Sequence, residues 1–311
     1  AIAIRGYAST ASTRGIATSL DGVRLNNFSF GTGQSDTPNI NLGVLDRIEM
    51  IRGPASAVHG NDAFHGVLAL HAFESGQDLS QASAEAGERG FYQTSARYSG
   101  QATMPLRLNL ALAASGQSDQ DRSYEYGAGN SIDKEQRYQS RTASLKFVSD
   151  PDADIAWRWG IYADEFDAGD FPTSVATHDS GQETSAYFTR LAVAKKLAGS
   201  QTLEASGYYR TSAVDRRTYL PPGSFLAQVK NHLGENAQGM ALTWRQPHQS
   251  GDSTQWAASL GYDVEQFDEG NLMLHYASGA VTDAVLGGVG KDREIASLVV
   301  DADTRFADGR W

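Results

Sequence analysis

Cysteine is absent from the 311-residue chain, so disulfide bonds and thiolate metal sites are excluded. Basic residues are scarce as well: 26 Lys and Arg stand against 37 Asp and Glu, which gives a net charge of −11. Nucleic-acid binding relies on basic side chains that neutralise phosphates. This charge balance therefore predicts that the chain has no nucleic-acid partner.

Long hydrophobic runs are also missing. No window approaches the roughly 18 apolar residues of a transmembrane helix, and the mean hydropathy is −0.41. The first residues, AIAIRGYAST, have no charged segment before an apolar core, so they carry no signal-peptide pattern. The 32 glycines, together with abundant Ser, Thr, Asn and Asp, instead favour an all-β protein with polar loops.

Alternating apolar and polar residues dominate the chain after residue 82. In PLRLNLALAAS four leucines occupy every second position, and DIAWRWGIYA places two Ile and two Trp in the same way. A period of two predicts strands that have one apolar face. We expect ten strands, near 82–88, 91–99, 105–115, 139–149, 154–166, 184–197, 202–212, 237–247, 254–267 and 293–306.

The connections after residue 99 alternate between short and long. The long ones span 116–138, 167–183, 213–236 and 268–292. An up-and-down barrel of the outer membrane has tight turns on one rim and long loops on the other, and its tilted strands of about 9–14 residues cross the bilayer. A soluble β-sandwich predicts the same alternation but gives no reason for long loops on one side only. The chain has no repeat of fixed period, which argues against a propeller or a solenoid.

Three blocks near the N-terminus resemble the plug domain of TonB-dependent outer-membrane receptors. They are Ile4-Arg5-Gly6, Asp21-Gly22-Val23, and the run IEMIRGPASA from Ile48 to Ala57, with further glycines at 60 and 66. Their order and spacing match the family. His59 and His65 depart from it, because a tyrosine and a glycine are usual at these two positions. If residue 65 has a positive φ, a histidine there is strained.

The resemblance implies an all-β membrane barrel with an N-terminal α+β plug domain, both partial. We expect residues 1–75 to form the C-terminal part of the plug, 76–81 a junction, and 82–311 about ten antiparallel strands of a larger barrel. One helical turn is expected near residues 41–45. A barrel of about 22 strands needs something that fills its lumen. The sequence thus predicts a fragment that, expressed alone, has two free edges and aggregates.

The resemblance also implies ion pairs between plug and barrel. We expect Arg5, Arg47, Glu49 and Arg52 to take part in them, Arg52 and Arg5 first of all. Conceivable partners on the inner wall are Glu204, Asp263 and Glu265, and the sequence does not choose among them. The alternative is that each of these plug charges is simply solvated.

Ligand contact is expected where plug and barrel loops meet at the outer rim, as the family implies. Aromatic side chains in polar loops suit an amphipathic ligand. Ordinary loop packing is the competing explanation for each of them. The candidate residues in the plug and barrel loops are Asn26, Asn27, Phe28, Phe30, Tyr124, Tyr126, Phe171, Tyr219 and Phe225.

No enzyme, cofactor or metal site is predicted. His59, His65 and His71 recur every six residues, a spacing that suits neither a helical nor a strand metal pair. Ser56 and Asp62 flank His59, but no Gly-x-Ser-x-Gly elbow surrounds the serine. We also expect an outer-membrane hydrolase to show a Ser, His and acid at one rim, which the sequence lacks. The remaining histidines, His178, His232, His248 and His275, are expected in solvated loops.

The function that the resemblance implies is energised uptake of a scarce, bulky nutrient through the bacterial outer membrane. A ferric siderophore, cobalamin, haem or a glycan are the candidate ligands. The partners would be the lipid bilayer, the ligand, and the TonB protein, which pulls on a segment not present in this chain. The alternatives are a surface receptor or adhesin barrel that does not transport, and a soluble β-sandwich binding module.

Overall fold

A computed structural model describes most of the chain. The described residues are 16–26, 40–53, 63, 65–103, 105–118, 122–125, 131–134, 137–169, 180–220, 224–246, 254–285 and 289–304. Several predicted residues lie outside them: Arg5, Asn27, Phe28, Phe30, Ser56, His59, Asp62, Tyr126, Phe171, His178 and His248. Within these ranges no helix is both long and apolar enough to cross a membrane.

The N-terminal part forms a small mixed sheet with the strand order β2-β1-β4-β3. Its strands are β1 (Ile16–Leu20), β2 (Val23–Arg24), β3 (Leu45–Arg52) and β4 (Gly66–Ala72), and β1 runs parallel to β4. Asp21 and Gly22 join β1 to β2 with φ of 47° and 82°, the left-handed pair that a two-residue hairpin favours. The predicted helical turn is present as the 3-10 helix η1 (Leu42–Val44).

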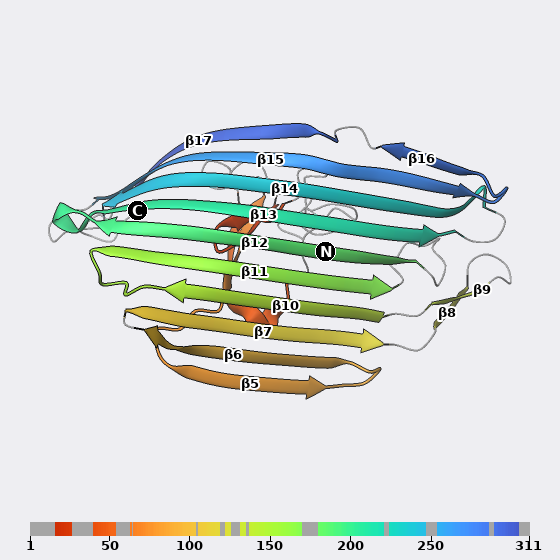
Figure 1. The fold of residues 1–311 in the computed structure, drawn as a ribbon, viewed down its shortest axis with the longest axis horizontal. Helices are drawn as coiled ribbons and strands as arrows, with labels where there is room; N and C mark the ends of the chain where they lie inside the picture. The colour runs from red at the N-terminus through yellow and green to blue at the C-terminus, as the bar shows by residue number, and fades with distance from the viewer. Residues whose placement is uncertain are drawn as a thin grey trace.

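An eleven-stranded antiparallel sheet forms a curved wall that follows chain order (Figure 1). The strands are β5 (Leu79–Ala86), β6 (Tyr92–Thr103), β7 (Leu106–Ser118), β10 (Arg137–Val148), β11 (Ile155–Gly169), β12 (Gly181–Lys196), β13 (Thr202–Tyr219), β14 (Leu226–Gln246), β15 (Thr254–Tyr276), β16 (Val281–Val285) and β17 (Lys291–Thr304). Both β16 and β17 pair with β15: β17 lies along residues 254–267 of β15, and β16 lies along residues 271–275. A separate hairpin, β8 (Arg122–Glu125) with β9 (Ser131–Lys134), lies between β7 and β10.

The ten expected strands are therefore confirmed, but two of the expected long loops are not. Most of 213–236 belongs to β13 and β14, which continue to Tyr219 and resume at Leu226. Most of 268–292 belongs to β15 and β16 in the same way. In these segments polar residues occupy outward positions, so the alternation of apolar and polar residues is weak. The strands predicted from that alternation are therefore too short.

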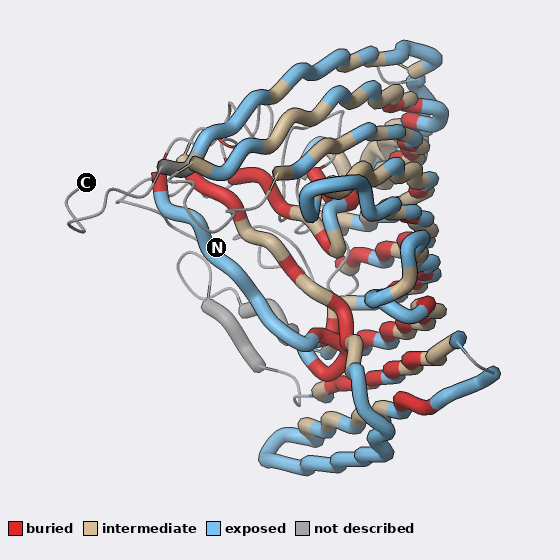
Figure 2. The backbone as a smooth tube through the Cα atoms, turned by 90° about the vertical axis from the view of Figure 1, so that its left-hand side faces the viewer, coloured by how far each residue is buried: buried red, intermediate tan, exposed pale blue. Residues whose placement is uncertain are grey.

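The wall has two chemically different faces. Side chains that point toward the plug include small and polar residues such as Ser144 and Thr142, both buried. The opposite face carries large apolar side chains that remain exposed, among them Met240 (66%), Leu260 (60%) and Leu298 (74%). Figure 2 shows the buried strands of the plug on the inner side of the wall, while the outer side is largely exposed. In water such an apolar surface would be unfavourable, whereas lipid contact removes that cost.

One hydrophobic core joins the plug sheet to the wall. The plug contributes eight buried residues and the wall contributes Ala111, Ala113, Tyr162 and Phe188. The rings of Tyr162 and Phe188 are stacked, with centroids 4.5 Å apart. The small side chains of β7 let the plug come close, and the aromatic pair fills the space farther along the wall. The plug is thus packed against the barrel and not merely tethered to it.

Candidate functional site: the plug–barrel interface

The η1 turn docks on β6, β7 and β10 through polar bonds. The Asn41 backbone N–H donates to Thr142 Oγ1 at 3.1 Å, and its side-chain amide donates to Ser115 Oγ at 2.9 Å. From the wall, Arg97 donates to the carbonyls of Gly43 at 3.0 Å and Leu45 at 2.7 Å. These bonds satisfy backbone groups that a short helical turn leaves free. The turn is therefore fixed to the wall at its N-cap and at its C-terminal end.

We expect Gly43→Val to loosen this docking. A Cβ at residue 43 would lie only 2.8 Å from the Ala113 Cβ and 3.0 Å from the Ser95 Cβ, so η1 must move away from the wall. Overpacking of this kind costs about 1–3 kcal/mol. The checking measurement is the rate of proteolysis of the plug in the whole receptor, which should rise. Gly76→Val is the matched control, because a Cβ there meets nothing within 4 Å; equal rates for both variants would contradict the prediction.

A buried cation lies where the plug hairpin meets β10, and we call its surroundings the Lys146 cluster: Asp21, Glu74, Lys146, Arg158 and Tyr162. Lys146 is 2% exposed and its Nζ lies 2.8 Å from Asp21 Oδ2 and 3.6 Å from Glu74 Oε2. The same ammonium donates to the Ala72 carbonyl at 2.8 Å. Arg158 pairs with Glu74 at 2.8 Å, and the Tyr162 hydroxyl donates to Asp21.

The five members of this cluster come from four separate places in the sequence. Asp21 is the left-handed turn residue between β1 and β2, and Glu74 follows β4, whereas the other three project inward from β10 and β11. An isolated buried charge is very unfavourable unless it is paired and hydrogen-bonded. Lys146 therefore stabilises the plug only in the position in which the carboxylates of Asp21 and Glu74 both reach its ammonium group.

A second group of charges holds the end of β2, and we call it the Arg24 cluster: Arg24, Arg210, Glu235, Glu265 and Arg293. Arg24 lies 3.6 Å from Glu265 Oε1, and Arg293 Nε donates to Glu265 Oε2 at 2.7 Å. Arg210 lies 3.8 Å from Glu235 and donates to the Arg24 carbonyl at 2.9 Å. Burial lowers the pKa of the Arg24 guanidinium, although the Glu265 carboxylate raises it in opposition.

Asn26 is fully buried beside this second cluster. Its side-chain oxygen accepts from the Thr18 N–H at 2.7 Å, and its amide donates to the Ile16 carbonyl at 2.9 Å. Arg210 also approaches the Asn26 carbonyl at 3.4 Å. Asn26 is therefore bonded both to β1 and to the wall residue Arg210. A ligand would reach this side chain only after movement of the plug, so its role as a ligand contact stays a prediction.

The predicted plug charges are placed differently from one another. Arg47 pairs with Glu49 of its own strand at 2.7 Å, and His71 lies 3.4 Å from the same carboxylate. The hydrogen bond from Arg47 lowers the pKa of Glu49. Arg52 is exposed at the end of β3. The structure thus joins Arg47 to Glu49 rather than to the wall.

Among the three wall carboxylates considered as partners, Glu265 meets a plug arginine, which is Arg24. The other two, Glu204 and Asp263, are bonded to wall residues: Glu204 to Arg190 and Arg245, and Asp263 to Tyr208. Sequence reasoning missed the Lys146 cluster altogether. The available signal was a lone lysine at an inward position of β10, among small polar residues, which marks a buried charge in need of partners.

Three of the predicted ligand aromatics belong to the described residues, and two of them, Tyr219 and Phe225, lie at the outer ends of wall strands. Tyr219 ends β13, and its backbone N–H donates to Ser180 Oγ at 2.9 Å. Phe225, just before β14, is 80% exposed and contacts Tyr276 edge to face with ring centroids 5.1 Å apart. Tyr124 belongs to β8. The tip of β15 thus supplies an aromatic neighbour, Tyr276, that the sequence did not indicate.

The histidines give no metal site in the described part of the chain, where no group of three or more His, Cys, Asp or Glu is suited to an ion. The expectation that His232 lies in a solvated loop is wrong: it is on β14, 2.7 Å from Asp215 and 2.8 Å from Glu269. His275 is likewise within β15.

A plug sheet seated by charged clusters inside a wall with an apolar outer face defines an outer-membrane receptor of the plug-and-barrel class. The family model "TonB-dependent Receptor Plug Domain" matches residues 1–67. The vitamin B12 transporter BtuB of Photobacterium profundum is 34% identical over 88 residues, which are 28% of this chain and 14% of the relative.

Solved receptors share the fold across nearly the whole chain. The ferric preacinetobactin receptor BauA of Acinetobacter baumannii matches with a TM-score of 0.67 at 12% identity, over 98% of this chain and 49% of that one. The copper transporter OprC matches with a TM-score of 0.65 at 13% identity, over 94% and 53%. The chain therefore spans about half the length of these receptors.

The resemblance expected from the sequence is confirmed: the chain has the plug and barrel wall of a TonB-dependent outer-membrane receptor. Its location is accordingly the bacterial outer membrane. A soluble β-sandwich is excluded, because one curved sheet surrounds a plug instead of facing a second sheet.

Proposed function

We propose that the receptor containing this chain imports a scarce, bulky nutrient across the outer membrane in a TonB-dependent step. A ferric siderophore, cobalamin, haem or a glycan is the cargo. The receptors that resemble it include a vitamin B12 transporter and siderophore receptors, and they are transport receptors rather than enzymes. We propose no catalytic site and no cofactor.

The Lys146 cluster is the observation that carries this proposal. The plug is joined to the wall by hydrogen bonds and ion pairs that can break and re-form, and Asp21 and Glu74 come just after the plug strands β1 and β4. A pull on the plug from the periplasm would withdraw these carboxylates from Lys146. A plug of this kind closes the lumen at rest and can still be displaced.

The division of the chain follows from the same proposal. Residues 1–75 act as the moving plug, 76–81 as the junction, and 82–311 as part of the fixed barrel. TonB would act on a segment N-terminal to residue 1. The ligand would bind at the outer rim, between the plug residues 26–30 and the barrel residues Tyr124, Tyr126, Phe171, Tyr219 and Phe225.

The test is uptake by cells that express the whole receptor, with and without a functional TonB protein. Labelled ferric siderophores, cobalamin, haem and glycans are offered in turn. The proposal expects one of these classes to accumulate inside the cell only when TonB is functional. Binding at the surface without TonB-dependent accumulation would overturn it in favour of a non-transporting receptor or adhesin.

We expect Phe225→Ala to weaken ligand binding by the whole receptor about tenfold, since truncating a central aromatic contact typically costs more than 1 kcal/mol. The measurement is equilibrium binding of the identified cargo to purified receptor. Val285→Ala is the matched control, because Val285 is 70% exposed at the end of β16, which pairs with β15. A Phe225→Ala affinity equal to that of the control would remove this residue from the proposed site.

A further inference from the structure

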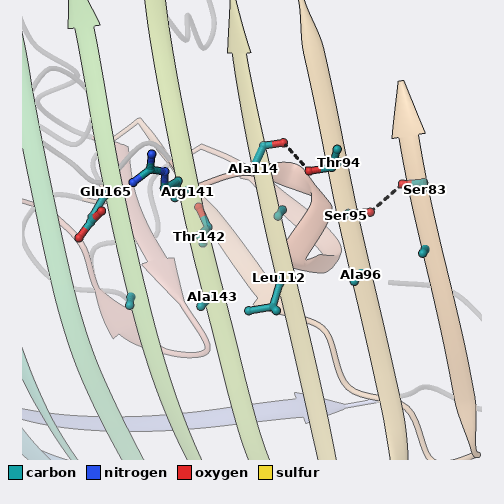
Figure 3. Close-up of a pocket in the computed structure, with 13 residues that line it drawn as sticks. Ser83, Thr94, Ser95, Ala96, Leu112, Ala114, Arg141, Thr142, Ala143 and Glu165 are labelled. Carbon is teal, nitrogen blue, oxygen red and sulfur yellow. Dashed lines mark hydrogen bonds between the residues drawn. The ribbon is translucent and has the colours of Figure 1, made fainter. Parts of the chain in front are cut away.

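The outer face of the wall contains a groove lined by small side chains (Figure 3). It has a volume of about 570 Å³ and crosses five consecutive strands, β5, β6, β7, β10 and β11. Two adjacent register rows form it. The lower row reads Ala82, Ala96, Leu112, Ala143 and Ala163, and the upper row reads Thr94, Ala114, Arg141 and Glu165.

The orientation of these rows follows from the pleat. Ser95 and Ala113 face the plug, since a Cβ on Gly43 would touch both, so their chain neighbours point outward. Outward residues of a barrel wall face the lipid. The groove thus opens toward the membrane and is not part of the barrel lumen.

The groove is a notch in an otherwise bulky surface. The next row toward the short-turn rim consists of Tyr98, Leu110, Leu145 and Ile161, all large. Five alanines and a threonine replace such side chains over the width of the groove. A flexible acyl chain packs better into a channel of this shape than against a flat wall, because in the channel it gains dispersion contacts on several sides.

Charge at one end of the groove indicates what kind of lipid fits. Arg141 is exposed on the outer-loop side of the lower row and makes no ion pair within the described part of the chain. Arg137 is exposed on the same face of β10, nearer the outer rim. Glu165 lies across from Arg141 and accepts a hydrogen bond from the Tyr187 hydroxyl at 3.1 Å. The basic side chain that borders the groove on β10 is thus available to a phosphate.

We propose that this groove binds one phosphate-bearing lipid of the outer leaflet. An acyl chain lies over Ala143 and Ala163, beside Leu112, and the phosphate is held by Arg141. The site is separate from transport, because it is on the opposite face of the wall from the plug. Its occupant stabilises the wall without taking part in uptake.

The test uses the whole receptor in detergent and counts retained lipids by native mass spectrometry. The probes are phosphatidylglycerol and a diacylglycerol with the same chains but no phosphate. We expect the unchanged receptor to retain one phosphatidylglycerol tightly. Arg141→Gln should retain it about fivefold more weakly, because the variant lacks one basic side chain beside the anionic headgroup. Ala143→Trp should lose both probes.

Matched controls separate the groove from general lipid contact. Ala258→Trp places the same bulk at an outward position of β15, and Lys195→Gln removes a charge from the outward face of β12. Both should retain the lipid. If Ala143→Trp fails to assemble, Ala96→Leu offers a milder filling of the same groove. Retention by Ala143→Trp or Ala96→Leu equal to that of Ala258→Trp would overturn the proposal, whatever the outcome of the uptake experiment.

Discussion

Replacement of Lys146 by methionine is expected to detach the plug from the barrel wall. Methionine keeps the length of the side chain but removes the ammonium that lies 2.8 Å from Asp21 and 3.6 Å from Glu74. Removal of one partner from a buried ion pair typically costs about 3–5 kcal/mol, because the other charge stays buried without compensation. The expected result is a receptor whose plug unfolds early and whose lumen admits large antibiotics.

The effect is measured by thermal unfolding of the purified whole receptor and by antibiotic sensitivity of cells that express it. Lys196→Met is the matched control, since Lys196 is half exposed and pairs at 3.7 Å with the exposed Asp152. Such surface pairs contribute less than about 1 kcal/mol. Equal stability losses for the two variants would contradict the role assigned to the cluster.

A double variant sharpens this test. Lys146→Met combined with Asp21→Asn removes both charges of the closest pair, while Glu74 keeps its partner Arg158 at 2.8 Å. The double variant should be more stable than Lys146→Met alone, because no unpaired carboxylate remains at residue 21. A loss equal to the sum of the two single losses would show that the residues act independently.

Leu242→Arg is expected to prevent most of the receptor from assembling in the membrane. Leu242 is 46% exposed on the outer face of β14, between Met240 and Trp244 on the same face. A lipid-facing arginine near the bilayer midplane costs about 2–4 kcal/mol in a barrel, and the cost falls to about 0–1 kcal/mol near the interface. In water the same exchange would be nearly neutral or favourable.

The measurement is the folded fraction in outer membranes and the free energy of folding into lipid vesicles. Gln238→Arg is the control for depth, because residue 238 has the same outward direction on β14 but lies four residues nearer the outer rim. Assembly of Leu242→Arg at the level of Gln238→Arg would mean that the lipid does not cover this part of the wall.

The strand architecture was predictable from the sequence to a large extent. Runs such as PLRLNLALAAS and DIAWRWGIYA alternate strictly, since lipid and lumen impose opposite polarities on successive side chains. The hairpin at Asp21-Gly22 was also predictable, because the two-residue turn requires φ values that this pair adopts readily. Prediction failed at the outer ends of β13 to β15, where charged side chains such as Asp215, His232 and Glu269 replace the apolar face.

The charged site was much less predictable. The motif around Arg52 drew attention to β3, yet the contacts that fix the plug to the wall involve Asp21, Glu74 and Arg24. Residues 21 and 146 are remote in sequence, and no local pattern says which inward residue of β10 faces which plug turn. The pairing of Asp21 with Lys146 depends on how the plug packs against the curved wall.

By itself, then, the sequence determined the class of protein: a plug with its family motifs, followed by strands built for a bilayer. These features are local, because turn conformations and side-chain alternation depend on neighbours in the chain. The tertiary structure alone decided which charges join the plug to the wall and where the outer face of the wall has a groove. Such features depend on the register between distant strands, and a single step of register exchanges every inward side chain for an outward one.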